Sequence, residues 1–237
     1  MEAKRAIVLL SGGLDSCASA AIAKHQEYSL YALTIDYGQK HNREIESARS
    51  IAHKLSVEKH VIFPLSLDIF GHSSLVDSSL QIPKPASTKD IGSSIPSTYV
   101  PARNTIFLSL ALAYAEVHDA DAIFIGVNAV DYSGYPDCRP AFIEAFQNMA
   151  TYATKRAVEG NPPSIQTPLL HLSKKQIIQK GVEVHAPFEL SWSCYQGGSQ
   201  ACGQCDSCLL RLQGFQDAGI DDPLKYSTYP MWYAQKN

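Results

Sequence analysis

The sequence predicts an α/β fold in which helices cover both faces of a doubly wound, mostly parallel sheet. Short apolar runs of strand length alternate along the chain with longer segments of helical character. The run at 121–127 is apolar almost throughout, which is typical of a parallel strand buried on both faces. With 237 residues, of which 45% are hydrophobic, the chain can bury one main core.

The N-terminal half is expected to alternate three strands with two helices. Apolar and β-branched residues predict strands at 6–10, 28–38 and 59–65. A helix begins beyond a pair of glycines after the first strand, and a second spans 41–55, where apolar side chains recur at helical spacing. The stretch 68–101 is rich in Ser, Pro and Gly, which predicts a long loop and a candidate lid.

The C-terminal half continues the alternation. A strongly apolar helix is expected at 105–118, followed by the strand at 121–127. Another helix is expected over 141–160, because a glycine and two prolines follow it. Ser173 and Gln176 stand in the capping-box relation and predict the start of a further helix.

The glycine-rich stretch SGGLDS lies between the first strand and its helix, where an open sheet binds ligands. Gly12 and Gly13 let the backbone approach a phosphate, and the hydroxyls of Ser11 and Ser16 can donate to its oxygens. A carboxylate beside phosphate needs a divalent cation, so we assign Asp15 to magnesium, directly or through water. The pattern fits neither the Walker A motif nor the dinucleotide fingerprint. A plain strand-to-helix turn is the structural alternative.

This stretch resembles the PP-loop of the N-type ATP pyrophosphatases, a superfamily that activates substrates as adenylates and releases pyrophosphate. The segments 36–41 and 100–116 are also similar to one family within it. Arg103 lies before the predicted helix, where its guanidinium would offset the charge of a phosphate or an acyl adenylate, unless it is an ordinary surface arginine. With Asp15 and Ser16 it completes the candidate catalytic set. The resemblance implies that ATP contacts Leu10, Ser11, Gly12, Gly13, Leu14, Asp15, Ser16, Cys17 and Ala18.

The segment 126–146 follows the strand at 121–127 and starts at the same edge of the sheet as the glycine-rich stretch. It combines carboxylates, aromatic rings and a cation, which together suit recognition of a planar polar ligand. A turn built on Gly134 and Pro136 with solvated polar groups is the alternative reading. The candidate substrate-binding residues are Asp131, Tyr132, Tyr135, Asp137 and Arg139.

This segment closely resembles that of the 7-cyano-7-deazaguanine synthase family, and the match extends along nearly the whole chain. The resemblance implies ATP-dependent conversion of 7-carboxy-7-deazaguanine and ammonia into the nitrile precursor of queuosine. A guanine-type edge presents adjacent N–H donors that suit the carboxylate of Asp131 or Asp137, and its ring suits a tyrosine face. Which aspartate reads that edge stays open. The chain shows no glutaminase-like segment, so free ammonia is the expected nitrogen source.

Four of the six cysteines lie within fifteen residues near the C-terminus, at Cys194, Cys202, Cys205 and Cys208. Four thiolates at such spacing can enclose a tetrahedral zinc ion and leave no open position, so the site is expected to be structural. The resemblance implies the same zinc site. An iron–sulfur cluster is the alternative that spacing leaves open. Cys17 is expected to be a core residue, and Cys138 is more plausible as a core thiol than as a nucleophile.

The sequence also predicts how the chain is divided and which classes of partner it binds. We expect a PP-loop domain at 1–190 and a zinc-binding segment at 191–237 packed on it. A formal charge of -3 and a pI of about 6.2 disfavour broad binding to nucleic acid or an anionic membrane, and a tRNA sulfurtransferase or a nucleic-acid module would need a more basic surface. The absence of long apolar runs and of signal-peptide order predicts a cytoplasmic protein. The expected partners are small molecules, and a homodimer is compatible with the sequence.

Overall fold

The computed structural model describes residues 3–77, 79–85, 95–130 and 135–233. Its sheet contains five parallel strands in the order β3-β2-β1-β4-β5. The direction of winding changes between β1 and β4. This confirms the expected doubly wound α/β fold. The strands are β1 (Arg5–Leu9), β2 (Ser29–Asp36), β3 (Lys59–Pro64), β4 (Ala122–Phe124) and β5 (Ser164–Gln166).

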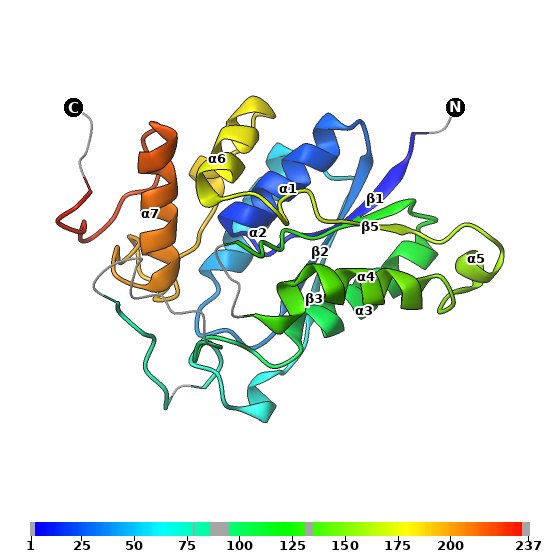
Figure 1. Cartoon of the computed structure of the whole chain (residues 1–237), viewed down its shortest axis with the longest axis horizontal. Helices are drawn as coiled ribbons and strands as arrows, with labels where there is room; N and C mark the ends of the chain where they lie inside the picture. Colours follow the sequence, from blue (N-terminus) through cyan, green and yellow to red (C-terminus); the bar gives the residue numbers. More distant parts are fainter. Residues whose placement is uncertain (1–2, 78, 86–94, 131–134, 234–237) are drawn as a thin grey trace.

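Helices cover both faces of the sheet (Figure 1). The first, second and sixth helices pack on one face, whereas the third and fourth pack on the other. The α-helices are α1 (Leu14–His25), α2 (Arg43–Lys54), α3 (Arg103–Val117), α4 (Pro140–Ala150), α5 (Lys155–Val158), α6 (Lys174–Glu183) and α7 (Asp206–Ala218). Short 3-10 turns are η1 (Asp68–Phe70), η3 (Pro136–Cys138) and η4 (Phe188–Leu190).

Strand β1 is the centre of the sheet and is buried on both faces. Ala6 and Val8 belong to the core beneath α1 and α2, whereas Ile7 and Leu9 belong to the core beneath α3 and α4. Successive side chains of a strand point to opposite faces, so a strand covered on both sides needs apolar residues at every position. The continuous apolar run in the sequence therefore reflects this central place.

The expectation of one helix over 141–160 is wrong. Helix α4 ends at Ala150, and a separate short helix, α5, begins at Lys155. Thr154 separates them because its side chain accepts a hydrogen bond from the backbone N–H of Ala157 and so caps the start of α5. Strand β5, which follows α5, has no counterpart among the expected elements. The capping box at the start of α6 is confirmed.

The segment that follows α6 contacts the turn between β1 and α1. The backbone N–H of Trp192 donates to the carbonyl of Gly12 at 2.8 Å, and the side chain of Ser193 accepts from the N–H of Leu14 at 3.4 Å. Helix α7 packs beside α6, where Gly214 lets the two approach: a Cβ there would lie 2.3 Å from Cγ of Lys174. The boundary expected between 190 and 191 stays a prediction.

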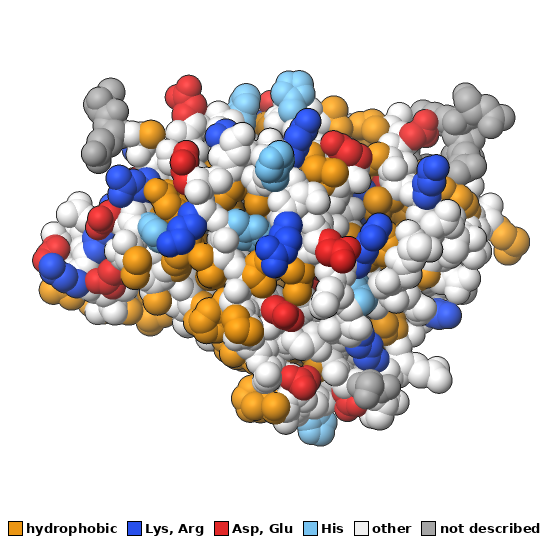
Figure 2. Space-filling model, turned by 180° about the vertical axis from the view of Figure 1, so that it is seen from behind, with side chains coloured by type: hydrophobic (Ala, Val, Ile, Leu, Met, Phe, Trp, Pro, Cys, Tyr) orange, Lys and Arg blue, Asp and Glu red, His pale blue; other side chains and the backbone are white. Residues whose placement is uncertain are grey.

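Part of the expected loop at 68–101 is described, namely 68–77, 79–85 and 95–101. It contains η1 and several turns, and the side chains of Leu75, Val76 and Val100 are buried against the face that α3 covers. Its role as a lid stays a prediction. Among the described helices, none has the length and apolarity needed to cross a bilayer. On the face seen in Figure 2, basic and acidic side chains are interspersed instead of being gathered by sign.

Candidate functional site

A cavity of about 220 Å³ lies beyond the carboxyl ends of β1, β2 and β4, where the winding of the sheet reverses. This is the place where open α/β sheets bind ligands. Leu33, Ile35 and Phe107 are apolar residues of the cavity lining, whereas residues of the phosphate loop and Lys174 supply polar groups. The cavity can therefore accept a ligand that is apolar at one end and charged at the other.

The phosphate loop, residues 11–16, is fixed by two close backbone approaches. Gly12 has a φ of +88°, and a Cβ on it would lie 2.0 Å from the carbonyl oxygen of Glu44. A Cβ on Gly126, at the end of β4, would lie 2.8 Å from the carbonyl group of Asp15. Only glycine fits at these two positions without displacing neighbouring backbone. The loop is thereby clamped between α2 and the end of β4.

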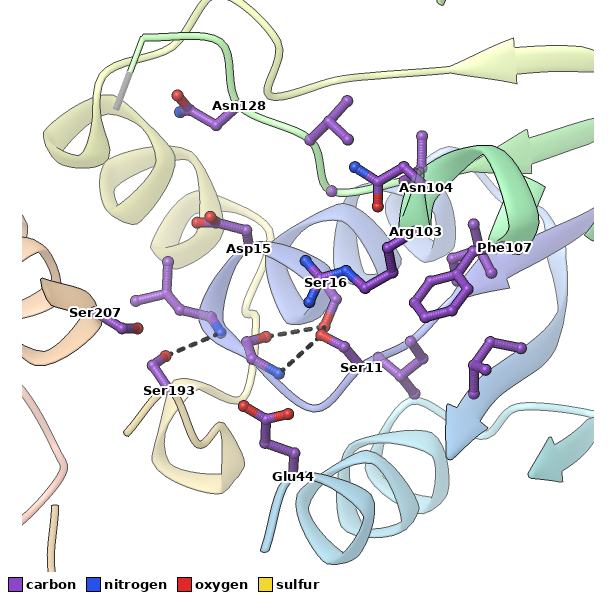
Figure 3. A pocket seen from close by; sticks show the side chains of 18 of the residues that line it. Ser11, Asp15, Ser16, Glu44, Arg103, Asn104, Phe107, Asn128, Ser193 and Ser207 are labelled. Atoms are coloured by element: carbon purple, nitrogen blue, oxygen red, sulfur yellow. Dashed lines mark hydrogen bonds between the residues drawn. The ribbon is translucent and has the colours of Figure 1, made fainter. Parts of the chain in front are cut away.

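The hydroxyls of the phosphate loop hold one another in place. Ser11 Oγ donates to Ser16 Oγ at 3.0 Å and accepts from the N–H of Gly13 at 3.3 Å (Figure 3). Ser16 Oγ in turn donates to the carbonyl of Gly13 at 3.0 Å. These groups lie at the N-terminus of α1, where backbone N–H groups and the helix dipole favour an anion. Of the residues predicted to contact ATP, most line the cavity, whereas Gly12, Cys17 and Ala18 are not part of its lining.

The carboxylate of Asp15 is bound by a lysine that sequence reasoning did not select. Lys174 Nζ lies 2.8 Å from each carboxylate oxygen of Asp15, and the side chains are 9% and 20% exposed, respectively. Lys174 is the first residue of α6, where the helix dipole disfavours a cation. Two lysines directly after the capping Ser173 were a local mismatch in the sequence, and such mismatches are a signal of function.

Arg103 lies at the cavity, as the sequence predicted from its place before a helix. Its guanidinium stacks over the rings of Tyr37 and Phe107, and it donates to the hydroxyl of Tyr37 at 3.3 Å. In Figure 3 it points from α3 toward Ser16. Burial raises the pKa of Tyr37 to about 12, so its hydroxyl stays protonated beside the arginine. A positive charge is therefore fixed opposite the phosphate loop.

A second carboxyl group, that of Glu44, was also missed. Glu44 lies in the first turn of α2, and its side chain points into the cavity close to Ser11 (Figure 3). Burial raises its pKa to about 7, with Arg103 lowering it and Cys194 raising it. Within the described parts of the chain it makes no hydrogen bond or ion pair. The spacing of apolar residues places Glu44 on the polar side of an amphipathic helix, so the sequence pattern offered no reason to select it as a site residue.

The candidate substrate residues do not all reach the cavity. Tyr135 lines it, stacks on Tyr99 and shares a hydrogen bond of 2.7 Å with Thr98. Arg139 is exposed at the start of α4 and is not part of the lining. Asp131 and Tyr132 lie outside the described residues. The substrate-binding role of these four residues stays a prediction.

Asp137 is buried beneath the start of α3. Its Oδ2 accepts from the backbone N–H of Asn104 at 2.9 Å, and its own carbonyl accepts from the Asn104 side chain at 3.0 Å. The same side-chain amide donates to Sγ of Cys138 at 3.2 Å. These bonds satisfy the first turn of α3 and tie it to η3. Asp137 therefore supports the helix that carries Arg103, and its role in reading the base stays a prediction.

The two isolated cysteines are buried. Burial raises the pKa of Cys17 to about 12. Burial, followed by the nearby charge of Asp137, raises the pKa of Cys138 to about 12 as well. A thiol with such a pKa is protonated at neutral pH and is a poor nucleophile. Although Cys138 lines the cavity, its environment is that of a core thiol.

The remaining cysteines form a compact cluster: Cys194, Cys202, Cys205 and Cys208. Their sulfur atoms all lie within 4.8 Å of one another, and those of Cys202 and Cys208 are 3.8 Å apart. Four backbone N–H groups point at the sulfur atoms of Cys194 and Cys202, at 3.3 to 3.4 Å. Such donors favour the thiolate form, so the cluster can hold a metal ion.

Comparisons with known proteins give close relatives over nearly the whole chain. A family model described as "Queuosine biosynthesis protein QueC" matches residues 5–219. The 7-cyano-7-deazaguanine synthase of Alcanivorax borkumensis is 56% identical over 225 residues, covering 94% of this chain and 99% of that protein. That of Pseudomonas putida is 54% identical over 228 residues, covering 95% and 100%. The solved structure of NMN synthetase from Francisella tularensis has a TM-score of 0.48 at 17% identity and covers 92% of this chain and 79% of that one.

Proposed function

This chain belongs to the QueC family of queuosine biosynthesis proteins, and on that premise we propose that it converts 7-carboxy-7-deazaguanine and ammonia into 7-cyano-7-deazaguanine at the expense of ATP. The observation that carries the proposal is the agreement between two independent features. Relatives more than half identical over almost their full length bear the name of this synthase. The cavity of about 220 Å³ also joins a phosphate loop to a part lined by aromatic and apolar groups.

The proposed chemistry has two activations. In the first, the substrate carboxylate attacks the α-phosphate of ATP, pyrophosphate leaves, and ammonia displaces AMP from the acyl adenylate to give an amide. In the second, the amide oxygen attacks the α-phosphate of another ATP, pyrophosphate leaves, and loss of AMP and of the two protons on nitrogen gives the nitrile. Each carboxylate oxygen thus departs on one AMP. The protein's contribution is positioning and neutralisation of charge, because the reacting groups all come from the substrates.

We assign the phosphates of ATP to the N-terminus of α1. The N–H groups of this helix start and the hydroxyls of Ser11 and Ser16 face the polar part of the cavity, which supports the assignment. The apolar part beside Leu33 and Phe107 suits the adenine ring. Arg103, fixed across the cavity, would offset the negative charge of the phosphates and of the acyl adenylate.

We assign magnesium to Asp15, directly or through water. A carboxylate in the first turn of α1, one-fifth exposed at the cavity, is the hard oxygen donor that this ion prefers. When bound, the ion would neutralise the pyrophosphate that leaves. Both oxygens of Asp15 now accept from Lys174, so we infer that Lys174 gives up part of this contact when the nucleotide binds. Its ammonium is then placed to contact a phosphate oxygen.

The base and the ring of the substrate are assigned to the segment 126–146. Tyr135 offers a ring at the cavity, and Asp131 and Tyr132, outside the described residues, are the neighbouring candidates. Asp137 already accepts a backbone hydrogen bond at the start of α3, so Asp131 is the better candidate for reading the donor edge of the base. The substrates are small molecules, and we place the enzyme in the cytoplasm.

We propose that the four-cysteine cluster holds one structural zinc ion. A Zn–S bond of about 2.3 Å in a tetrahedron places two sulfur atoms about 3.8 Å apart, and the measured distance from Cys202 to Cys208 is 3.8 Å. A cubane iron–sulfur cluster binds each thiolate to a different iron and needs wider spacing than the 4.8 Å limit of this cluster. Zinc would therefore fix the fold of the C-terminal segment. Elemental analysis of protein purified without oxygen tests this, with about one zinc per chain expected.

The reaction is tested by incubating the purified protein with 7-carboxy-7-deazaguanine, ATP, magnesium and ammonium, followed by mass spectrometry. We expect the nitrile, together with AMP and pyrophosphate in equal amounts. Omitting ammonium should leave pyrophosphate release from the first activation while abolishing the nitrile. Formation of ADP and phosphate, or no turnover of the carboxylate, would refute the proposed function.

A further inference from the structure

Glu44 stands out because its carboxyl group lines the cavity and makes no hydrogen bond or ion pair with the described residues. Only two carboxyl side chains line the described part of the cavity, those of Asp15 and Glu44. Both oxygens of Asp15 accept from Lys174. Glu44 has no such partner within the described residues, although its carbonyl group is fixed against Gly12 of the phosphate loop. Its side chain points into the cavity beside Ser11 (Figure 3). It is therefore a rigidly carried acceptor that faces a ligand space.

The proposed reaction needs an acceptor of this kind. Ammonia is present at neutral pH chiefly as ammonium, and the nitrile nitrogen carries no hydrogen. Four protons must therefore leave the nitrogen in each turnover: one from ammonium, one as the amide forms, and two as the amide becomes the nitrile. The two AMP molecules carry away oxygen atoms but none of these protons. A base close to the phosphate loop is required to collect them.

We propose that Glu44 binds the incoming nitrogen nucleophile as its cation and accepts the protons that this nitrogen loses. The inference rests on the proposed function and assigns to one residue the removal of protons from the nitrogen nucleophile. In the first transfer an N–H bond of ammonium breaks, its electron pair stays on nitrogen, and the proton moves to a carboxylate oxygen of Glu44. The freed pair then forms the bond to the acyl carbon, and AMP leaves with the electrons of the C–O bond. Glu44 passes its proton to solvent before the next transfer.

The surroundings of Glu44 suit a carboxyl group that changes protonation. Arg103 from α3 is the cation that faces it, and Cys194 is the neighbouring group that opposes its charge. Tyr37, at the end of β2, and Tyr195 also line this space. The pKa of about 7, raised chiefly by burial, allows both proton uptake and release near neutral pH. Arg103 is fixed on Tyr37 and Phe107, so Glu44 stays available to a further cation.

The test compares Glu44→Gln with Glu46→Gln. Glutamine keeps the size of the side chain and cannot accept a proton, and the absence of a hydrogen bond to the described residues predicts that the variant folds. Glu46 is exposed on the same helix, and its side chain forms an ion pair with Arg43, so it is a matched control. Three rates are measured: pyrophosphate release without ammonia, amide and nitrile formation with ammonium, and hydroxamate formation with hydroxylamine, which is largely uncharged at neutral pH.

For Glu44→Gln we expect pyrophosphate release within about twofold of wild type and a loss of about 100-fold or more with ammonium. Hydroxamate formation should fall much less than the ammonium rate, because neutral hydroxylamine loses one proton as the hydroxamate forms and needs no deprotonation before it attacks. Glu44→Asp, which withdraws the carboxylate by one methylene, should lose part of the ammonium rate and confirms the result independently of Glu44→Gln. Glu46→Gln should behave as wild type in all three assays.

An equal loss of pyrophosphate release in Glu44→Gln would place Glu44 in nucleotide or magnesium binding and overturn the inference while leaving the proposed function intact. A full ammonium rate in this variant, or a loss of the hydroxylamine reaction as large as that of the ammonium reaction, would also overturn it. If wild type itself releases no pyrophosphate with the carboxylate substrate, the proposed function fails, and that failure is visible before any variant is compared.

Discussion

Replacing Lys174 with methionine tests the ion pair that occupies Asp15. Methionine keeps an unbranched stem against Gly214 but removes both contacts of 2.8 Å to the carboxylate. Exposed ion pairs contribute about 0.2–1 kcal/mol, whereas breaking a fully buried pair costs about 3–5 kcal/mol. The side chains of Lys174 and Asp15 are 9% and 20% exposed, which places this pair between the two limits. We expect Lys174→Met to lower the free energy of unfolding by about 2 kcal/mol.

A double-mutant cycle isolates that contribution. Wild type, Lys174→Met, Asp15→Asn and the double variant are unfolded in urea without nucleotide, and the coupling free energy is expected to be about 2 kcal/mol. The coupling should persist at high salt, because partly buried pairs are poorly screened. Lys175→Met, at the exposed neighbouring position, is the matched control and should leave stability nearly unchanged. If the effects of the two single substitutions were additive, with a coupling below about 0.5 kcal/mol, the ion pair would not stabilise the fold as expected.

Four further perturbations follow from the same contacts. Gly126→Ala should reduce both stability and ATP binding, measured by urea unfolding and calorimetry, because its Cβ would meet the backbone of Asp15 at 2.8 Å; unchanged ATP affinity would contradict the clamp. Asp222→Asn should cost about 3–5 kcal/mol in urea unfolding, since it unpairs Arg211, whose side chain is 2% exposed. The folded pKa of about 7 for Glu44 exceeds its ordinary value of 4.5, so the stability of wild type should fall between those pH values. In Glu44→Gln this slope should be absent, leaving it more stable than wild type by on the order of 2 kcal/mol at pH 8. Cys138→Ser should turn over within about twofold of wild type, and a large loss would make that thiol a participant.

The features predicted correctly from sequence are those encoded locally. Apolar runs predict β1 and β2 because each strand carries its own burial pattern, and SGGLDS predicts the tight turn between β1 and α1 because its glycines and helix start are contiguous. That this turn binds phosphate stays a prediction. The cysteine spacing likewise predicted a compact cluster. In each case a short window contains the chemistry, so no knowledge of the tertiary fold is needed.

The features missed depend on contacts between distant parts of the chain. Lys174 acquires its role from Asp15, 159 positions earlier, and periodicity alone assigns Glu44 to a solvated helix face. The break after α4 was missed because Thr154 reads as one polar residue inside a helical pattern until its cap to Ala157 is seen. The sequence did not show that the buried carboxylate of Asp137 accepts a hydrogen bond from the start of α3, and its predicted role as a substrate ligand stays a prediction. Each of these features depends on a contact that the local sequence pattern does not reveal.

The contacts between the phosphate loop and the segment after α6 determine when the enzyme becomes competent during synthesis. The loop leaves the ribosome first, yet the groups that brace it, at Lys174, Trp192 and Ser193, are made roughly 160 to 180 residues later. At about 5–20 residues per second this delay is on the order of ten seconds or longer. A nascent chain that has folded only its first strands therefore carries an unbraced loop.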